Sequence, residues 1–378
     1  MSLANYFRAF FLFTIAVVLV NGSRLSIADQ LDIKAKSIAE VLQDNILFVS
    51  NRDGDYDIYL MKLASGEVKQ LTHNNHDDME AVASPDGQKI LFTSSVKGNS
   101  DIFVMNANGS SLTRLTTHPG LDSSAQWSPD GKKIAFVSDR HRYINVYVMD
   151  ADGSNVINIS QTKTAAMKPL WSPDGRVIAF EHSNSVKSKN IMLSTPNGST
   201  QSKLTKTLHS NDFDMAWSPD GSKIAYVSMR KKLINIYVID STGKNEIQLT
   251  NTPWIDAAPS WSSDSKKLAF LSTRDDGARR QVYVIHADGS NEHRVGQSGA
   301  EEMNVIWSSQ DAYMFYVSYQ DGNAELYQYN VLNTKSTRLT HHIAHDYRPL
   351  LMPQFSTPLA PSFNDSTHDK VGFVKTRI

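Results

Sequence analysis

Histidines gather in one kind of segment along this chain. Seven of its 12 histidines stand between a recurring Leu-Thr pair and the next recurring acidic residue: His73, His76, His118, His209, His341, His342 and His345. Neutral imidazole is a common metal ligand, and the chain has no cysteine, so a metal would need His and carboxylate ligands. Candidate ligands of a divalent metal are His76, His209, His341 and His345.

A second set of residues changes charge from copy to copy at one repeated position. It stands three residues into each expected first strand: Glu80, Ser124, Lys168, Asp214, Ala258, Asn304 and Arg348. Mixed charges of this kind suit a partner with complementary charges. In an enzyme, Lys168 or Arg348 could instead stabilise developing negative charge. We expect a partner to bind across Glu80, Lys168, Asp214 and Arg348, with His76, His209 and His345 around them, and we assign no catalytic residue.

A repeat of about 44 residues positions both sets. Each copy has an acidic residue, then Trp-Ser-Pro-Asp-Gly, an apolar run such as IAFVS, a second apolar run such as NVYVMD, and a Leu-Thr end. The aromatic position is held by Trp127, Trp171, Trp217, Trp261 and Trp307, and by Ala83 and Leu351 in the outermost copies. We expect these tryptophans to form the core between neighbouring copies.

Each copy reads as four short strands joined by tight turns. Pro-Asp-Gly and Asp-Gly-Ser favour turns, and alternating apolar and β-branched residues favour strands over helices. The second strand occurs seven times, from ILFVS at Ile46 to MFYVS at Met314. These patterns predict an all-β, seven-bladed β-propeller of four-stranded antiparallel blades.

The two ends of the repeat complement each other. The first copy, 45–72, lacks a first strand, and the last element, 346–355, consists of a first strand alone. We expect the N- and C-terminal strands to share one blade, which would close a propeller over residues 45–355 and remove exposed sheet edges.

Other recurring polar residues are expected to serve the fold. The acidic position (Asp78, Asp122, Asp212, Asp256, Glu302, Asp346) recurs with an arginine after the second strand (Arg52, Arg140, Arg230, Arg274). We interpret the two sets as Asp–Arg pairs or loop caps that join blades. The run Asp53, Asp55, Asp57 resembles a calcium loop, but Ile58 stands where that loop needs glycine, so we predict a hairpin loop.

The N-terminus has the pattern of a secretory signal. Arg8 precedes the apolar run 9–20, which is too short to span a bilayer, and small residues stand at Ser26 and Ala28. We expect a signal peptide over 1–28, a short helical lead-in over 29–44 and a disordered tail over 356–378. The protein would then be periplasmic or secreted, with no transmembrane span.

Composition narrows the choice of partners. The chain carries 38 Lys and Arg against 39 Asp and Glu, so no strong overall field draws it to nucleic acid or to an anionic bilayer. We expect an envelope protein or glycan as partner, no nucleic acid, and a monomer.

The segments WSPDGKKIAFVSDR (127–140) and NVYVMDADGSN (145–155) resemble the TolB-type propeller repeat, over about 45–355. The resemblance implies a periplasmic propeller that binds proteins through one face. TolB itself is expected to carry an α/β domain before a six-bladed propeller, so the resemblance concerns the repeat. The repeat also resembles that of the seven-bladed oligogalacturonate lyases, a family with a divalent metal held by histidines.

Two functions follow as hypotheses. The first is a non-catalytic protein- or glycan-binding scaffold of the cell envelope, without cofactor. The alternative is a metal-dependent polysaccharide lyase or hydrolase resembling oligogalacturonate lyase, which needs at least three imidazoles to converge over the central channel. We favour the scaffold because the histidine spacing matches no recognised metal motif.

Overall fold

The computed structural model describes residues 44–353, apart from 97, 186–187, 208–209 and 297. Strands are the regular elements of these residues, and no helix occurs among them. The expected signal peptide and tail, and all but Asp44 of the expected lead-in, lie outside the described residues.

The strands repeat in sets of four, and the position of a strand in its set determines its exposure. The first strands are β4 (Asp78–Ala83), β8 (Asp122–Trp127), β12 (Ala166–Trp171), β16 (Asn211–Trp217), β20 (Asp256–Trp261), β24 (Glu302–Trp307) and β28 (Asp346–Met352). The second strands are β1 (Asn45–Ser50), β5 (Lys89–Val96), β9 (Lys133–His141), β13 (Ile178–Ser185), β17 (Lys223–Arg230), β21 (Lys267–Ser272) and β25 (Tyr313–Ser318).

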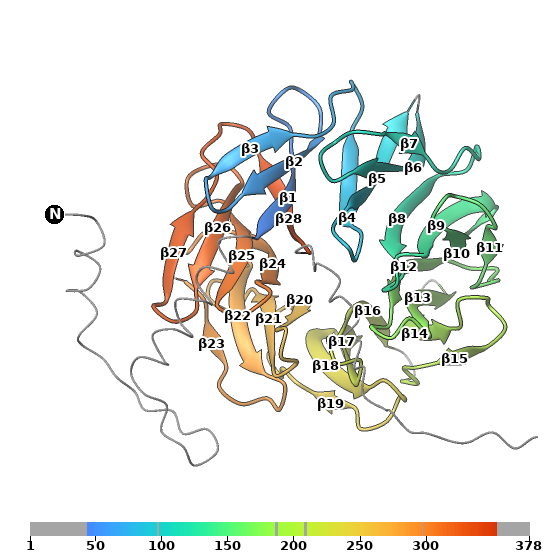
Figure 1. Cartoon of the computed structure of the whole chain (residues 1–378). Helices are drawn as coiled ribbons and strands as arrows, with labels where there is room; N and C mark the ends of the chain where they lie inside the picture. The colour runs from blue at the N-terminus through green and yellow to red at the C-terminus, as the bar shows by residue number, and fades with distance from the viewer. Residues whose placement is uncertain (1–43, 97, 186–187, 208–209, 297, 354–378) are drawn as a thin grey trace, which may run out of the picture.

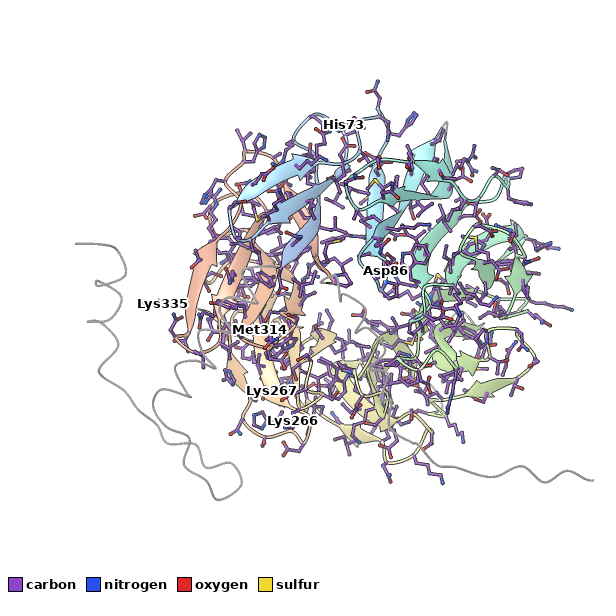
Figure 2. All side chains as sticks on the ribbon, viewed as in Figure 1. His73, Asp86, Lys266, Lys267, Met314 and Lys335 are labelled. Atoms are coloured by element: carbon purple, nitrogen blue, oxygen red, sulfur yellow. The ribbon has the colours of Figure 1, made fainter. Side chains whose placement is uncertain are left out.

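The third strands are β2 (Asp57–Lys62), β6 (Asn99–Asn106), β10 (Tyr143–Asp150), β14 (Ser188–Ser194), β18 (Leu233–Asp240), β22 (Gln281–His286) and β26 (Glu325–Asn330). The fourth strands are β3 (Glu67–Gln70), β7 (Thr113–Arg114), β11 (Ile157–Asn158), β15 (Gln201–Lys203), β19 (Ile247–Gln248), β23 (His293–Arg294) and β27 (Lys335–Arg338). Second and third strands are the most buried. In Figure 2, Met314 of β25 lies within its sheet and Lys335 of β27 at the outer edge.

The Pro-Asp-Gly turns form as their residue types predict. Ser128 Oγ donates to Asp130 Oδ1 at 2.7 Å and accepts from the N–H of Lys133 at 2.9 Å. Gly131 has φ 69°, a conformation that glycine adopts without steric cost. The turn therefore reverses the chain between β8 and β9 with its polar groups satisfied.

The sheets surround a central channel, with first strands innermost and fourth strands outermost (Figure 1). Five sheets have four strands; one has eight, two four-stranded halves joined by the single parallel pair Lys189↔Asn211. The last described strand completes the first sheet, in the order β28-β1-β2-β3, with antiparallel pairs from Asn45↔Met352 to Ser50↔Asp346.

The tryptophans connect successive sheets, as predicted. The indole N–H of Trp171 donates to the carbonyl of Gln126 at 3.2 Å, and Trp307 donates to Ser260 at 3.0 Å. Trp127 packs in a buried cluster with Leu91 and Ile102 of the preceding sheet. Packing therefore joins each first strand to the one before it, and the indoles of Trp171, Trp217, Trp261 and Trp307 add a hydrogen bond.

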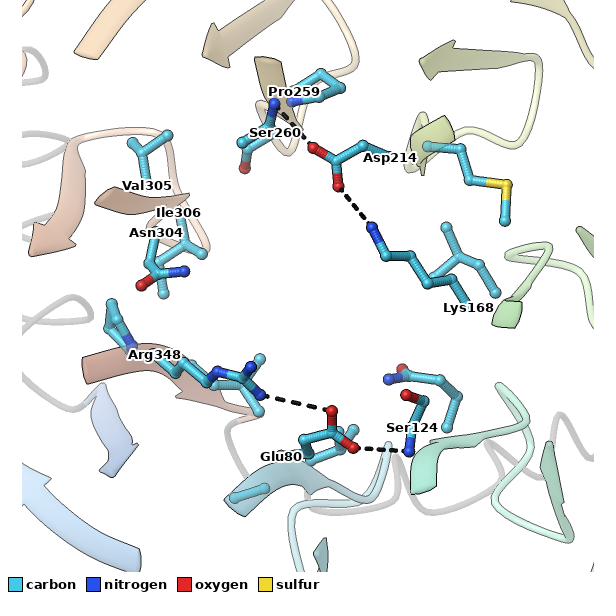
Figure 3. Close-up of a pocket in the computed structure, with 18 of the residues that line it drawn as sticks. Glu80, Ser124, Lys168, Asp214, Pro259, Ser260, Asn304, Val305, Ile306 and Arg348 are labelled. Atoms are coloured by element: carbon cyan, nitrogen blue, oxygen red, sulfur yellow. Dashed lines mark hydrogen bonds and ion pairs between the residues drawn. The ribbon is translucent and has the colours of Figure 1, made fainter. Parts of the chain in front are cut away.

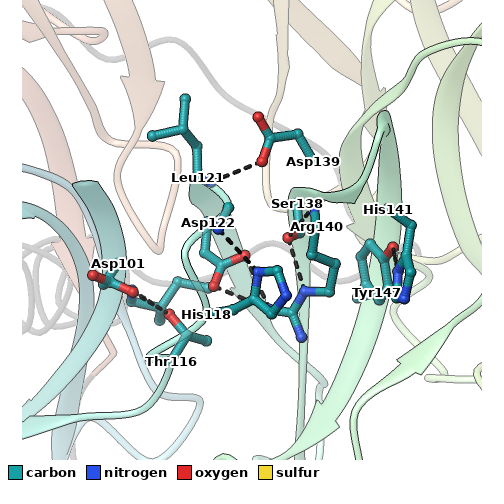
Figure 4. Close-up of polar contacts among 12 residues, drawn as sticks. Asp101, Thr116, His118, Leu121, Asp122, Ser138, Asp139, Arg140, His141 and Tyr147 are labelled. Atoms are coloured by element: carbon teal, nitrogen blue, oxygen red, sulfur yellow. Dashed lines mark hydrogen bonds and ion pairs between the residues drawn. The ribbon is translucent and has the colours of Figure 1, made fainter. Parts of the chain in front are cut away.

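The Asp–Arg pairs are present but lie inside a sheet. Arg140 of β9 donates from Nη2 to both carboxylate oxygens of Asp122 of β8 at 3.0 Å, with its guanidinium 4.9 Å from the Tyr147 ring centroid (Figure 4). Arg52–Asp346 and Arg274–Asp256 repeat this pairing. The expectation that such pairs join blades is therefore wrong, because both partners belong to adjacent strands of one sheet.

Arg230 departs from this pattern. Its guanidinium pairs with Glu246 at 2.9 Å, while Asp212 accepts a hydrogen bond from Ser228 at 2.6 Å. A long arginine can reach either carboxylate, so spacing alone does not determine its partner.

Ending the chain after His345 removes β28, including Asp346, the partner of Arg52. We expect the melting temperature to fall by roughly 5 °C or more, because β1 becomes an unpaired edge and a buried ion pair is lost. A chain ended after Phe355 keeps β28 and should melt with the full-length protein. Equal melting temperatures for the two truncations would contradict the role given to β28.

Candidate functional site

A cavity of about 540 Å³ lies in the central channel, with walls supplied by all seven first strands. The repeated variable position contributes to the wall in every copy: Glu80, Ser124, Lys168, Asp214, Ala258, Asn304 and Arg348 (Figure 3). Counting three residues into each first strand therefore identifies residues that share one cavity.

All seven residues have a left-handed backbone, with φ between 51° and 56°. Such a conformation costs a non-glycine residue roughly 1–2 kcal/mol. It coincides with a register shift in the pairing of first and second strands, for example between Ser123 and Gln126. A bulge of this kind redirects a side chain. The fold thus turns one side chain per first strand toward the channel, whatever its type.

Carboxylates hold some of these bulges in place. Glu80 Oε2 accepts from the N–H of Ser124 at 2.7 Å, and Asp214 Oδ2 accepts from the N–H of Ala258 at 3.0 Å. Each of these bonds runs from one variable residue to the variable residue of the next first strand. The acidic side chains of the cavity therefore also order its wall.

The cavity charges form two groups. Arg348 Nη1 lies 3.7 Å from Glu80 Oε1, and Lys168 Nζ lies 3.5 Å from Asp214 (Figure 3). Lys168 Nζ also lies 3.3 Å from Glu181. Burial by itself lowers the pKa of Lys168, but the carboxylates of Glu181 and Asp214 outweigh it and the pKa is raised. Lys168 is therefore a cationic hydrogen-bond donor, suited to binding an anion and poorly suited to accepting a proton.

Glu181 is a site residue that the sequence interpretation missed. Its side chain is 3% exposed and accepts from the N–H of Asp214 at 2.9 Å, in addition to its contact with Lys168. The signal was present in the sequence: the second strand IAFEH has glutamate where IAFVS and IAYVS have valine. A charge at a position that is buried and uncharged in the other copies marks a departure from the repeat.

The predicted histidines do not line the cavity where they are described. His345 accepts at Nδ1 from the N–H of Ala324 at 3.1 Å and stacks on Tyr347, with ring centroids 5.7 Å apart. His76 and His341 are absent from the cavity wall, and His209 lies outside the described residues. Within the described ranges, these histidines form no group of three ligands, so the imidazoles present do not fit a metal centre and we derive no step through one.

One acidic group has the proximity of a metal site. Ligand atoms of Asp53, Asp55 and Asp57 lie within 4.8 Å of one another. Asp57 is fully buried, and burial, with the nearby charges of Asp53 and Asp55, raises its pKa to about 7 despite a hydrogen bond from Thr72. In two other copies the equivalent residue is Asn145 or Asn235, which accept from Ser160 and Thr250. The Thr72 contact is therefore part of the repeat.

A ring of antiparallel four-stranded sheets around a channel defines a β-propeller. The model of the TolB beta propeller domain matches residues 43–138, 84–213 and 140–357. The chain belongs to this family. No helix of the described residues is long and apolar enough to cross a membrane.

Sequence similarity to an individual protein covers a much shorter part of the chain than the family match does. The Tol-Pal system protein TolB of Alcanivorax borkumensis is 37% identical over 76 residues, 19% of this chain and 18% of that protein. The match thus spans less than a fifth of that relative's length.

Solved structures resemble the chain at low identity. TolB from Acinetobacter baumannii has a TM-score of 0.54 at 20% identity, covering 73% of this chain and 70% of that one. An oligogalacturonate lyase in complex with manganese scores 0.64 at 18%, covering 75% and 85%. A puromycin hydrolase scores 0.64 at 12%, covering 80% and 52%. At such identity the likeness establishes the fold alone.

Replacing Ala258 by glycine should test the backbone strain at the cavity. Glycine adopts positive φ without the cost that alanine carries, so Ala258→Gly should leave the free energy of unfolding unchanged or raise it by up to about 1 kcal/mol. Ala257→Gly, at the preceding paired position of β20, should lower it by roughly 0.5–1 kcal/mol. Equal losses in urea unfolding would argue against strain at Ala258.

Asp57→Asn should reduce the pH dependence of stability. A carboxyl whose pKa is raised on folding binds more protons in the folded state between about pH 4 and 7, so the free energy of unfolding falls as pH rises through that range. Asparagine removes this term while keeping an acceptor for Thr72. Urea unfolding at pH 5 and pH 8 should show a smaller decrease for the variant than for the parent. Asp101→Asn, which breaks the 2.5 Å ion pair with Arg114, should instead destabilise the protein at pH 8.

Proposed function

We propose that the chain is an exported, non-catalytic scaffold that binds an envelope protein or a glycan at the channel cavity. The supporting observation is the set of seven left-handed positions, which deliver seven non-repeating side chains to one cavity. A fold that needs only packing has no use for charge differences at an otherwise repeated position. Binding uses them, because complementary charges give specificity.

We further propose that the propeller has seven blades and is closed by β28 and β1. This count takes the two halves of the eight-stranded sheet as separate blades, since one parallel residue pair joins them. Closure in this manner protects the edge of β1 and holds the cavity wall as a rigid ring. A rigid wall lowers the entropy cost of binding.

The proposed location is the periplasm or the exterior of the cell, with the monomer as the working form. The apolar run at 9–20 supports export, and the relative's name places TolB in the Tol-Pal system. An envelope protein is therefore the first partner to look for. Nucleic acid is a poor candidate because the overall charge is −1.

A metal-dependent polysaccharide lyase is the second candidate. The fold similarity to oligogalacturonate lyase, over 75% of this chain, favours it. The lyase would require further metal ligands in addition to the described histidines, and His209, which lies outside the described residues, could be one of them. Metal analysis of the purified protein separates the two: stoichiometric metal that is lost in His76→Ala or His345→Ala would favour the lyase.

Charge reversal in the cavity tests the scaffold. Lys168→Glu and Arg348→Glu should each weaken capture of the partner from envelope extracts by roughly 1–3 kcal/mol, because each leaves carboxylates without their cation and repels an anionic partner group. The folded fraction, followed by circular dichroism, should stay the same, since both side chains are about half exposed.

Lys132→Glu is the matched control, because Lys132 is an exposed lysine in a Pro-Asp-Gly turn at the opposite end of the strands. It should capture the partner as the parent does. If Lys132→Glu weakens capture as much as Lys168→Glu, the partner does not bind at the cavity.

A further inference from the structure

One face of the ring has an uneven distribution of exposed charges, and these charges lie outside the cavity. We call it the entry face: it carries the loops that lead into the first strands and the hairpins between second and third strands. Three successive repeats of this face, β8 to β19 (Figure 1), carry five exposed cationic side chains: Arg142, Lys163, Lys206, Lys231 and Lys232. Among the described residues, none of the five has an ion pair.

Exposed apolar side chains accompany these cations. Leu121, Ile144, Leu233, Trp254 and Ile255 are between 37% and 51% exposed. Together the ten residues form what we call the basic–apolar rim. Hydrogen bonds and strand contacts hold its pieces side by side: Thr162 N–H donates to Asn145 at 2.9 Å, and Ile234 pairs with Ile255.

The rim projects from the ring. Pairing of β17 with β18 continues two residue pairs beyond Ser228↔Asn235, to Arg230↔Leu233, whereas β21 and β22 stop at the equivalent pair Ser272↔Gln281. Two extra pairs add about 7 Å of strand. The hairpin tip, with Lys231, Lys232 and Leu233, therefore extends beyond the paired ends of β21 and β22, and the β13–β14 hairpin of the preceding sheet is extended in the same way.

The cations of the hairpin tips stand at positions with positive φ, a backbone conformation that is unfavourable for residues other than glycine. Lys231 and Lys232 have φ 51° and 70°, and Arg142 has φ 74°. A two-residue turn with both φ values positive is best served by Asn-Gly. Lysine at both positions forgoes that stability, which points to a use for the two charges at the tip.

We propose that the basic–apolar rim docks the protein onto a bilayer surface that carries anionic phospholipids. Lysine and arginine near such a surface attract its headgroups, while tryptophan and aliphatic side chains enter the interface between headgroups and acyl chains. A flat surface fits projecting tips, whereas a peptide needs a groove. Aliphatic side chains offer little to a glycan, so the bilayer fits all ten residues.

This proposal does not conflict with the balanced overall charge. The entry-face loops that follow the rim, between β21 and β24, pair their charges internally, as in Arg280–Glu301 at 2.6 Å and Arg279–Asp276 at 3.8 Å. Attraction to the bilayer is then local, acting within a screening length of about 8–10 Å. None of the ten rim residues lines the cavity, so the proposal is independent of what binds there.

Vesicle binding tests the rim. The chain beginning at Asp29, which lacks the apolar run, is mixed with phosphatidylcholine vesicles with or without phosphatidylglycerol, and binding is followed by cosedimentation. We expect binding to the anionic vesicles alone, weakened by added salt. Trp254, the most exposed of the six tryptophans, should shift its emission to the blue and become shielded from an aqueous quencher.

Lys231→Asn combined with Lys232→Gly is the decisive variant, because Asn-Gly suits the turn and should fold at least as well as the parent. Removing two cations should weaken binding to anionic vesicles by roughly tenfold or more. Trp254→Ser should weaken it through loss of apolar contact. Lys132→Glu, away from the rim, and Lys168→Glu, in the cavity, should bind vesicles as the parent does.

Two results would overturn the proposal: equal binding to both kinds of vesicle, or an unchanged affinity in the Asn-Gly variant. If that variant binds vesicles normally but no longer captures an envelope protein, the rim is a protein-docking surface instead. Loss of vesicle binding with normal partner capture would leave the proposed scaffold function intact.

Discussion

No sheet of this repeat buries both of its faces alone, and the contact between successive sheets determines the rest of the structure. Each four-stranded sheet exposes apolar residues on two faces, which the sheets before and after it cover. The tryptophan at the end of a first strand packs in that contact, and the indoles of Trp171, Trp217, Trp261 and Trp307 also donate to the first strand before their own. First strands are therefore spaced evenly around the channel, and equivalent residues reach it at equivalent depth.

Much of the strand arrangement could be predicted from the sequence, because each strand and each turn has its own recurring residues in the repeat. Turn residues recur at fixed offsets, so strand order and the pairing of β28 with β1 could be predicted without long-range information. The cavity residues could be located for the same reason, by counting from the acidic residue. Glu181 shows where counting is insufficient, because it stands outside the counted position although the fold brings it against Lys168.

The left-handed backbone at the cavity was beyond prediction from the sequence. Glycine or asparagine usually signals positive φ, yet lysine, arginine, glutamate and alanine occupy these positions. The conformation is imposed by the strand pairing on both sides of the bulge, which is a tertiary property. The partner of Arg230 could not be predicted from the repeat either, since Arg230 pairs with Glu246 while Asp212 accepts from Ser228.

At these left-handed positions the backbone conformation repeats from copy to copy, whereas the side chain does not. Because strand pairing sets the backbone at the bulge, residues of different charge occupy it in different copies, although Glu80 and Asp214 also help to order the wall. At the cavity the charges are paired with one another, so their field is short-ranged and acts on a partner in contact. At the rim the cations have no ion-pair partner among the described residues, so their field extends into solvent. Under the two proposals, the paired charges of the cavity would select what binds, and the unpaired cations of the rim would hold the molecule at a surface.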